Sequence, residues 1–282
     1  MNKLKCGDRQ LELSKTHVMG ILNVTPDSFS DGGSLFTANA IDKDALLMRA
    51  QAMVLSGATI LDIGGESTRP NAEEVTSQQE MDRVLPALEL LSANLDVVLS
   101  VDTSNPALIS VAADYGAGMI NDVRALEREG AVEAVARGDL PVCLMHMQGT
   151  PATMQNDPLY KDVTTEVLSY LLSRADVCKM NGIDQQRIIL DPGFGFGKTL
   201  EQNVKLLKDT DVFVASGYAV LIGTSRKSMF GQLLGRAVDD RLAASLSSVA
   251  YAAMKGAFIV RVHDVQATCD VVKVIAAIND IE

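Results

Sequence analysis

The stretch VVLSVDTSNPALISVAADYGAGMIND, residues 97–122, contains one complete unit of the pattern that decides the fold. It begins with a continuous apolar run, Val97 to Val101, of the kind found in strands that are buried on both faces. The run ends on the carboxylate of Asp102. Helical spacing follows over Pro106 to Tyr115, with proline in the first turn, where a helix tolerates it. A second apolar run then ends on Asn121, so the stretch predicts a strand, a helix and a second strand.

The same unit recurs along the chain, which carries eight short and mostly continuous apolar runs. We expect strands at Val18 to Leu22, Thr59 to Ile63, Val97 to Val101, Met119 to Ile120, Val142 to Met145, Ile188 to Leu190, Ala219 to Ile222 and Phe258 to Val262. We expect helices at Asp44 to Ser56, Gln78 to Leu91, Pro106 to Tyr115, Val163 to Met180, Met229 to Leu234, Arg241 to Met254 and Val265 to Ile278. Glycines follow several of these helices as C-caps, at Gly57, Gly116, Gly182 and Gly256.

Alternating strands and helices predict a parallel sheet with crossover helices. Eight such units in 282 residues fit a closed barrel better than a doubly wound open sheet, which is the alternative from the same pattern. The predicted fold class is therefore α/β, with a single (β/α)₈ TIM barrel as one domain over residues 1–282. A short N-terminal hairpin, Leu4 to Leu13, is expected to plug the bottom of the barrel.

Composition excludes several classes of partner. The formal net charge of −11 argues against nucleic acid and anionic membrane surfaces, which need concentrated Lys and Arg. The cysteines, at positions 6, 143, 178 and 269, lie too far apart for a Cys-x-x-Cys zinc site and suggest no disulfide framework. The first residues lack the apolar core of a signal peptide, and no apolar run reaches the ~18 residues of a membrane span. We expect a soluble protein of the reducing cytoplasm.

Polar or charged side chains end nearly all of the apolar runs, as in sites that bind an anionic heterocycle. They are Asn23, the turn Gly64-Gly65-Glu66, Asp102, Asn121, His146, Asp191, the turn from Gly223 to Lys227, and Arg261 with His263. In a parallel barrel these ends share one face, and catalytic residues come from several of them. A buried carboxylate is costly unless it is well paired, so Asp102, Asn121 and Asp191 together suggest a ligand rich in N–H donors. The alternative for Asp102 and Asn121 is that each caps the helix after it.

Two basic segments follow the last strands. Arg261 and His263 are two positions apart and share a face, near the place where such barrels frequently bind phosphate groups. The alternative is that both pair with helices on the outer wall. The turn containing Lys227 precedes a short helix and could favour an anion or a ring oxygen, or it could be an ordinary exposed basic turn.

The segment DPGFGFGKT, residues 191–199, looks like a P-loop but lacks its spacing. Gly193 and Gly197 enclose three residues where the motif needs four. We interpret Asp191 as the end of a buried strand, and the glycines as a sharp turn that brings Phe196 over the opening of the barrel.

Three connections are longer than packing requires, namely Val24 to Ala40, Gly64 to Thr76 and Met147 to Asp162. The first two have the makings of a lid that excludes water and brings Arg69 to a leaving group. Acidic residues in or beside these connections, Asp27, Asp62 and Glu66, could bind a metal, although ordinary hydrogen bonding is the simpler interpretation. Most of the 12 methionines are expected to fill the core, and Met145 is the one placed to contact a ligand.

Eight strings carry a close resemblance to the dihydropteroate synthase family of bacterial folate synthesis, in order over about residues 17–265. They are NVTPDSFSDGG (23–33), GGESTRP (64–70), SVDTS (100–104), IND (120–122), LMHMQG (144–149), LDPGFGFGK (190–198), TSRKS (224–228) and RVHDV (261–265). Asn71 departs from the family, which usually has glycine after Thr-Arg-Pro. That departure bears on the flexibility of the second long connection.

The resemblance implies a barrel that joins p-aminobenzoate to 6-hydroxymethyl-7,8-dihydropterin diphosphate and releases diphosphate with Mg²⁺ present. By position, it implies contacts with the pterin diphosphate from Thr68, Asp102, Asn121, Met145, Asp191, Lys227, Arg261, Val262 and His263. It implies contacts with p-aminobenzoate from Phe29, Thr68, Pro70, Phe196 and Ser225. The catalytic groups would be Arg69, Asp102, Lys227, Arg261 and His263, and Asn23 would contact the Mg²⁺. A homodimer is also the habit of the family.

Two rival functions share the pterin pocket. One is a superfamily enzyme that transfers a methyl group from methyltetrahydrofolate to a corrinoid protein, which has no need of the connections bearing Phe29 and Arg69. The other is a non-catalytic pterin-binding protein, which would not need Arg69, Arg261 and His263. The sequence therefore favours the synthase, acting by a dissociative substitution.

Overall fold

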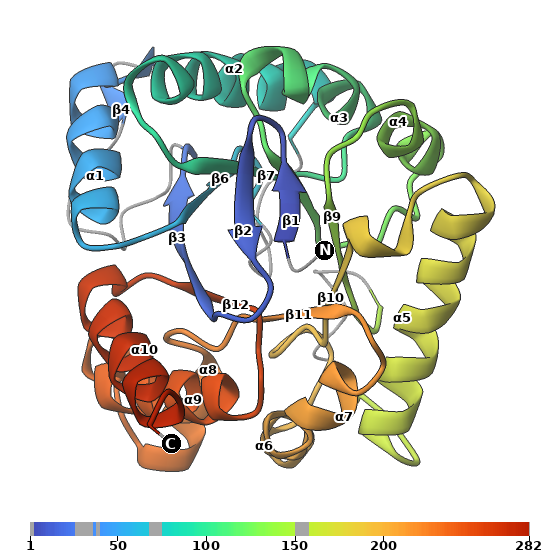
Figure 1. Ribbon diagram of the computed structural model, residues 1–282, viewed down its shortest axis with the longest axis vertical. Helices are drawn as coiled ribbons and strands as arrows, with labels where there is room; N and C mark the ends of the chain where they lie inside the picture. The colour runs from blue at the N-terminus through green and yellow to red at the C-terminus, as the bar shows by residue number, and fades with distance from the viewer. Residues whose placement is uncertain (1–2, 26–35, 38–39, 68–74, 150–157, 282) are drawn as a thin grey trace.

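A closed parallel barrel forms the centre of the molecule (Figure 1). The computed structural model describes residues 3–25, 36–37, 40–67, 75–149 and 158–281. Within these ranges the barrel strands are β3 (His17–Asn23), β6 (Ile60–Gly64), β7 (Val98–Asp102), β8 (Met119–Asp122), β9 (Val142–Met145), β10 (Ile188–Asp191), β11 (Ala219–Ile222) and β12 (Ile259–Val262). They neighbour one another in chain order, and β12 closes the barrel by pairing with β3, with Val260 opposite Val18. The eight expected strands and the closed barrel are confirmed, and the doubly wound alternative is wrong.

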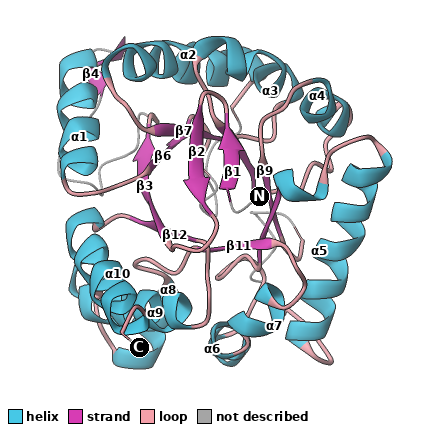
Figure 2. Cartoon of the chain, in the orientation of Figure 1, coloured by secondary structure: helices cyan, strands magenta, loops and turns pink. Residues whose placement is uncertain are grey.

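Helices form a ring outside the strands (Figure 2). They are α1 (Lys43–Leu55), α2 (Ser77–Asn94), α3 (Pro106–Ala112), α4 (Ala131–Arg137), α5 (Val163–Met180), α6 (Leu200–Lys208), α7 (Thr210–Val214), α8 (Ser228–Leu234), α9 (Leu242–Met254) and α10 (Val265–Asn279). The seven expected helices are confirmed within one to three residues at their ends, except that α3 passes into a 3-10 turn at Ala113–Tyr115. The expected glycine C-caps all have positive φ angles, from 88° to 107°. None of the helices in the described ranges has both the length and the apolar character that a membrane span needs.

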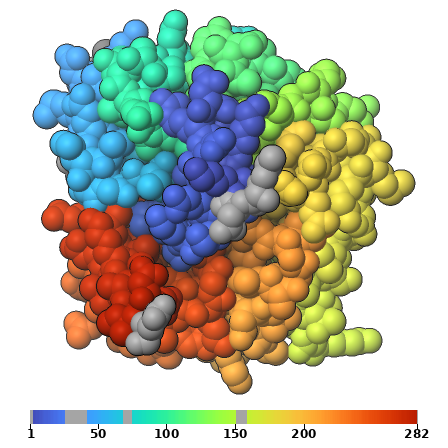
Figure 3. Space-filling model, viewed as in Figure 1, coloured from blue at the N-terminus to red at the C-terminus, as the bar shows by residue number. Residues whose placement is uncertain are grey.

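The N-terminal hairpin consists of β1 (Lys3–Cys6) and β2 (Arg9–Glu12), which pair antiparallel. Its apolar side chains, Leu4, Cys6 and Leu11, share one buried cluster with the first inward-facing residues of the barrel strands, such as Met19 and Met119. Figures 1 and 3 show the hairpin lying across the middle of this end of the barrel. The expected plug is therefore confirmed, and the opposite end is the one left for a site.

The interior of the barrel changes from apolar to polar along the strands. The first inward layer is Met19, Ile60, Val98, Met119, Cys143, Ile189, Leu221 and Ile259. Because strand side chains alternate, the next inward positions are Ile21, Asp62, Ser100, Asn121, Met145, Asp191, Gly223 and Arg261. Three charged groups and two further polar side chains thus lie one layer above a fully apolar floor. Burying such groups costs free energy unless they bind a ligand or pair with one another.

The long connections end at helix caps. Thr76 is the N-cap of α2 and forms a capping box with Gln79, and Asp162 caps α5 by accepting from the N–H of Thr165. The first connection contains a small two-stranded sheet, β4 (Phe36–Thr37) with β5 (Ala40–Ile41). The caps at Thr76 and Asp162 fix where the second and third connections join their helices, near the C-terminal ends of the barrel strands.

Candidate active site

The polar layer of the barrel is organised around Arg261 of β12. Its Nε donates to Asp62 Oδ2 at 2.6 Å, and an Nη donates to Asp102 Oδ2 at 2.8 Å. Asp62 belongs to β6 and Asp102 to β7, so one guanidinium joins residues of three strands across the interior. The inward direction of Arg261 excludes the outer-wall alternative for this residue. The two bonds engage two of the five N–H groups that a guanidinium carries.

Burial and neighbouring charges shift the ionisation of this group. Burial alone would lower the pKa of Arg261, but the Asp62 and Asp102 carboxylates raise it above its ordinary value, so the guanidinium stays charged. Burial raises the pKa of Asp102 to about 7; the Arg261 charge opposes this rise, and the Asp62 carboxylate adds to it. Two carboxyl groups share one cation here, which gives this part of the interior a preference for a donor-rich or cationic partner.

Asn121 joins the same network from β8. Its Nδ2 donates to Asp62 Oδ2 at 3.1 Å, which leaves the amide oxygen as an acceptor. Beside it, Asp62 Oδ1 and Ser100 Oγ are buried without a hydrogen-bond partner among the described residues, and the two residues are neighbours in the register of β6 and β7. The helix-capping alternative fails for Asp102, since the N-cap of α3 is Asn105. Buried polar atoms without partners are uncommon and mark this layer as a place where a ligand or water is accommodated.

Asp191 ends β10 on the same layer, and the glycine turn follows it. Its Oδ1 accepts the Gly193 N–H at 2.7 Å. Burial raises the pKa of Asp191 to about 6, although the Gly193 bond and the Lys227 charge both oppose the rise. Gly193 has a φ of +70°, and a Cβ there would lie 1.9 Å from the His146 carbonyl oxygen, so only glycine fits. The predicted sharp turn is confirmed.

Lys227 lies directly before α8, and its Nζ sits 4.3 Å from the centroid of the Phe196 ring. Burial, and then the charge of Arg261, lower the pKa of Lys227 to about 8, and Asp191 acts in the opposite direction. The turn is not simply exposed, because Thr224 and Ser225 are buried. Ser225 Oγ lies 3.1 Å from His263 Nδ1, which draws the ends of β11 and β12 together.

The structure thus brings together most of the predicted site residues that it describes. Met145 is buried at the end of β9, and Asn23 ends β3. Val262 does not join them through its side chain, which packs in the hydrophobic layer between the barrel and the helices. Asp27, Phe29, Thr68, Arg69 and Pro70 lie outside the described residues.

Two acidic residues that could have bound a metal make hydrogen bonds instead. Asp62 binds Arg261 and Asn121, and Glu66 forms a two-pronged ion pair with Arg124 at 3.0 and 3.1 Å. Sequence reasoning did not identify the partner role of Asp62. The available signal was a carboxylate at the centre of the apolar run ILDIG, at an inward position between Ile60 and Gly64.

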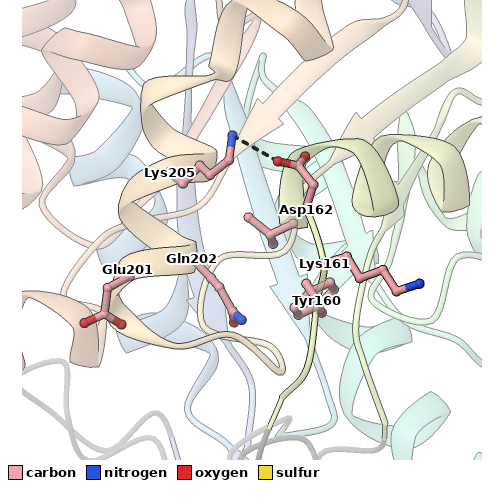
Figure 4. Close-up of a pocket in the computed structure, with 7 residues that line it drawn as sticks. Tyr160, Lys161, Asp162, Glu201, Gln202 and Lys205 are labelled. Carbon is pink, nitrogen blue, oxygen red and sulfur yellow. Dashed lines mark ion pairs between the residues drawn. The ribbon is translucent and has the colours of Figure 1, made fainter.

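A depression lies outside the barrel, between the start of α5 and α6 (Figure 4). It has a volume of about 170 Å³ and is lined by Tyr160, Lys161, Asp162, Val163, Glu201, Gln202 and Lys205. Lys205 and Asp162 face each other across it at 3.6 Å. None of these residues belongs to the polar layer, so the strand-end layer remains the candidate active site.

Comparison with known proteins agrees with this geometry. The chain matches the pterin binding enzyme family over residues 19–263. The dihydropteroate synthase of Escherichia coli strain K12 is 50% identical over 275 residues, covering 98% of this chain and 96% of that protein. The solved structure of Yersinia pestis dihydropteroate synthase with a sulfonamide drug complex has a TM-score of 0.94 at 46% identity, covering 99% of this chain and 100% of that one. Xanthomonas albilineans dihydropteroate synthase with 4-aminobenzoic acid has a TM-score of 0.91 at 44% identity, covering 100% and 99%.

A parallel barrel with a charged layer at its strand ends is an architecture that enzymes use widely. The full-length matches go further: the chain belongs to the pterin binding enzyme family, among the dihydropteroate synthases.

Proposed function

We propose that this chain condenses p-aminobenzoate with 6-hydroxymethyl-7,8-dihydropterin diphosphate to give 7,8-dihydropteroate and diphosphate. The observation that carries the proposal is the convergence of Asp102, Asn121, Asp191, Lys227 and Arg261 above an apolar floor. Acceptors at the base of the layer match the amino and ring N–H groups of a dihydropterin. Hydrogen bonds to charged groups of this kind are worth about 1.5–3 kcal/mol each.

Asp191 and Asn121 are the acceptors that we assign to the edge of the pterin. Asp191 uses Oδ1 for Gly193 and keeps Oδ2 as a further acceptor, and the Asn121 amide oxygen remains available beside the Asp62 bond. Lys227 supplies a donor for the ring, because its ammonium is held at the barrel opening over Phe196. In this scheme Met145 contacts the ring, while Val262 contributes through its backbone.

Departure of the diphosphate is the demanding step, because an arylamine nucleophile is already neutral at pH 7. We assign charge stabilisation at the leaving group to Arg69, Arg261 and His263, with Thr68 nearby. If the C–O bond breaks early, the methylene becomes cationic, and the carboxylates of Asp102 and Asp191 would stabilise it. The substitution is then dissociative.

A magnesium ion fits the oxygens at the rim of the layer. Asn23 Oδ1 lies 3.4 Å from the position that a Cβ on Gly64 would occupy, so the absence of a side chain there leaves room beside this oxygen, whereas Asp102 Oδ2, 3.8 Å from the same position, is bound by Arg261. Mg²⁺ prefers oxygen and usually takes most of its ligands from water and substrate phosphates. The described residues contain no group of three or more His, Cys, Asp or Glu side chains suited to a metal. We therefore assign Asn23 as the protein ligand, and when bound the ion would neutralise charge on the diphosphate.

The second substrate is assigned to the outer part of the site. Phe29, Thr68, Pro70, Phe196 and Ser225 are the residues proposed to frame p-aminobenzoate. Of these, Phe196 lies over Lys227, and Ser225 is buried beside His263. The Xanthomonas relative with 4-aminobenzoic acid and the Yersinia relative with a sulfonamide drug support this choice of substrate class.

The methyltransferase alternative is not favoured, because the full-length relatives are dihydropteroate synthases at up to 50% identity. The direct test incubates the pure protein with pterin diphosphate, p-aminobenzoate and Mg²⁺ and measures dihydropteroate by mass spectrometry, omitting each component in turn. Product only in the complete mixture supports the proposal, and its absence there contradicts it. We further propose that the chain acts as a homodimer in the cytoplasm.

A further inference from the structure

Lys198, the last residue of the segment GFGFGK, is a buried cation that the proposed reaction does not use. Its side chain is 4% exposed, and its ammonium forms no ion pair within the described residues. Its Nζ instead donates to the carbonyl oxygens of Gly193 at 2.8 Å and Phe196 at 2.9 Å. It also lies 3.0 Å from His146 Nδ1. Burying a lysine amine is costly, so an amine satisfied only by neutral acceptors calls for a reason beyond packing.

His146, directly after β9, is the side chain that contacts the Lys198 amine. Burial, and then the charge of Lys198, lower the pKa of His146 to about 3, so the ring is neutral at neutral pH. When Lys198 is protonated its ammonium only donates, so His146 Nδ1 is then the acceptor and the ring proton resides on Nε2. Tyr170 packs edge-on against the ring at 5.0 Å and helps to fix its orientation. Burial, followed by the charge of Lys227, lowers the pKa of Lys198 to about 7, and Asp191 opposes this shift.

The turn at residues 193–197 packs closely against the segment that follows β9. A Cβ on Gly193 would meet the His146 carbonyl oxygen, and one on Gly197 would lie 2.6 Å from the Gln148 carbonyl oxygen. Lys198 also donates to the His146 carbonyl at 3.4 Å, while its two shorter bonds go to the carbonyls at the two ends of the bend, one of which belongs to Phe196 itself. Lys198 therefore fixes the backbone of the residue whose ring covers Lys227.

We propose that Lys198 is a positioning residue for the aminobenzoate part of the site, holding the turn at residues 193–197 against His146 so that Phe196 stays over Lys227. The inference rests on the proposed function, which assigns Phe196 to the second substrate. Lys198 has no hydrogen bond to Asp102, Asn121, Asp191 or Lys227, and its charge acts on Asp191 less than burial, the Gly193 bond and the Lys227 charge do, so its influence on pterin binding is expected to be small.

The experiment compares Lys198→Met with the wild-type protein in steady-state assays of both substrates. Methionine keeps the unbranched side chain as far as Cε and removes the donors. We expect the KM for p-aminobenzoate to rise about tenfold or more, as for loss of hydrogen bonds from a charged group, with kcat at saturation within about threefold. The Kd of a pterin analogue, measured by calorimetry, should stay within about twofold. An unchanged KM for p-aminobenzoate, or equal losses for both substrates, would overturn the inference.

Two further variants separate positioning from general stability of the turn. Tyr160 donates to the Gly197 carbonyl at 2.9 Å from the outer side, so Tyr160→Phe is the matched control and should change the KM for p-aminobenzoate less than about twofold. In a Phe196→Ala background, Lys198→Met should add less than about twofold, because its effect passes through the Phe196 ring. An effect of Tyr160→Phe as large as that of Lys198→Met, or full additivity with Phe196→Ala, would contradict the role.

Circular dichroism checks that each variant folds. If Lys198→Met does not fold, Lys198→Leu replaces it, because it also removes the donors, and the same outcomes apply. The wild-type assay distinguishes a failure of the proposed function from a failure of the positioning role. If the wild-type protein does not make dihydropteroate, the proposed function is refuted. If the wild-type protein is active and the Lys198 variant has an unchanged KM for p-aminobenzoate, only the positioning role is refuted.

Discussion

The substitution Asp191→Asn should change the affinity for the pterin and the free energy of unfolding in opposite directions. The amide oxygen can still accept from the Gly193 N–H, as Asp191 Oδ1 does at 2.7 Å. The amide nitrogen then replaces Oδ2 and presents N–H groups to a pterin edge that itself consists of donors. Loss of a charge-assisted bond worth about 1.5–3 kcal/mol weakens the affinity for the pterin by roughly 10- to 150-fold.

The same substitution should favour folding above pH 6. Folding raises the pKa of Asp191 from 3.8 to about 6, chiefly through burial. A group with a raised pKa stabilises the fold below its unfolded value, and this contribution is lost as the pH rises through the folded value. The shift of about two units corresponds to about 3 kcal/mol. Because asparagine does not titrate, and pH 4 already lies just above the unfolded value, the free energy of unfolding of Asp191→Asn should gain about 2.5 kcal/mol relative to wild type between pH 4 and pH 8.

Two measurements on the pure proteins test this reasoning. Isothermal titration with a pterin analogue at pH 8 gives the affinity, and urea unfolding at pH 4 and pH 8 gives the stability of each protein. Asp191→Asn should bind more weakly while gaining stability relative to wild type as the pH rises. Normal affinity, or a stability difference that does not change with pH, would refute the assignment of Asp191 as a buried acceptor for the ligand.

Other residues of the site give further expectations. Arg261→Ala should lower turnover by roughly 100-fold or more, because it removes a cation from the leaving group and leaves the Asp62 carboxylate without its guanidinium partner. An unchanged rate in assays of dihydropteroate formation would exclude Arg261 from stabilising the leaving group. With a pKa of about 6, Asp191 is about one-tenth ionised at pH 5, so the wild-type affinity for the pterin should be about tenfold weaker there than at pH 8. The Asp191→Asn variant should lose the part of this slope that is centred near pH 6, and keep only the part that comes from Asp102 and Lys227, whose pKa values are about 7 and about 8. Glu66→Gln should lower the free energy of unfolding by about 1–3 kcal/mol in urea, since it breaks the largely buried pair with Arg124, and an equally stable variant would show that the pair contributes little.

Most of the fold could be predicted from the sequence because its signals are local. Continuous apolar runs marked the strands, and the helix at Val163–Met180 was predicted to the residue from its spacing. The sequence did not reveal α4, α6 or α7, which are 5 to 9 residues long. Helices this short depend on packing against the barrel and on caps such as Thr199, and they offer too few turns for a periodic pattern.

The site was predictable as a set of strand ends but not as a network. Closure of the barrel brings Asp102, Asn121, Asp191 and Arg261 together, so reading the ends of the runs was sufficient to find them. The Arg261–Asp62 bond joins residues 199 positions apart, and no local pattern reveals such a pair. Lys198 drew notice only as part of a P-loop lookalike, because its partners are backbone carbonyls, which the sequence does not distinguish. The roles of the residues in the two long connections stay predictions.

The most direct measurement is a crystal structure of the protein soaked with 6-hydroxymethylpterin. The account predicts density for a flat bicyclic ring inside the barrel, with its donor edge on Asp191 and Asn121 and with Lys227 at the opposite side. A ring found elsewhere, such as in the hollow between α5 and α6, or no density in the barrel at saturating ligand, would contradict it.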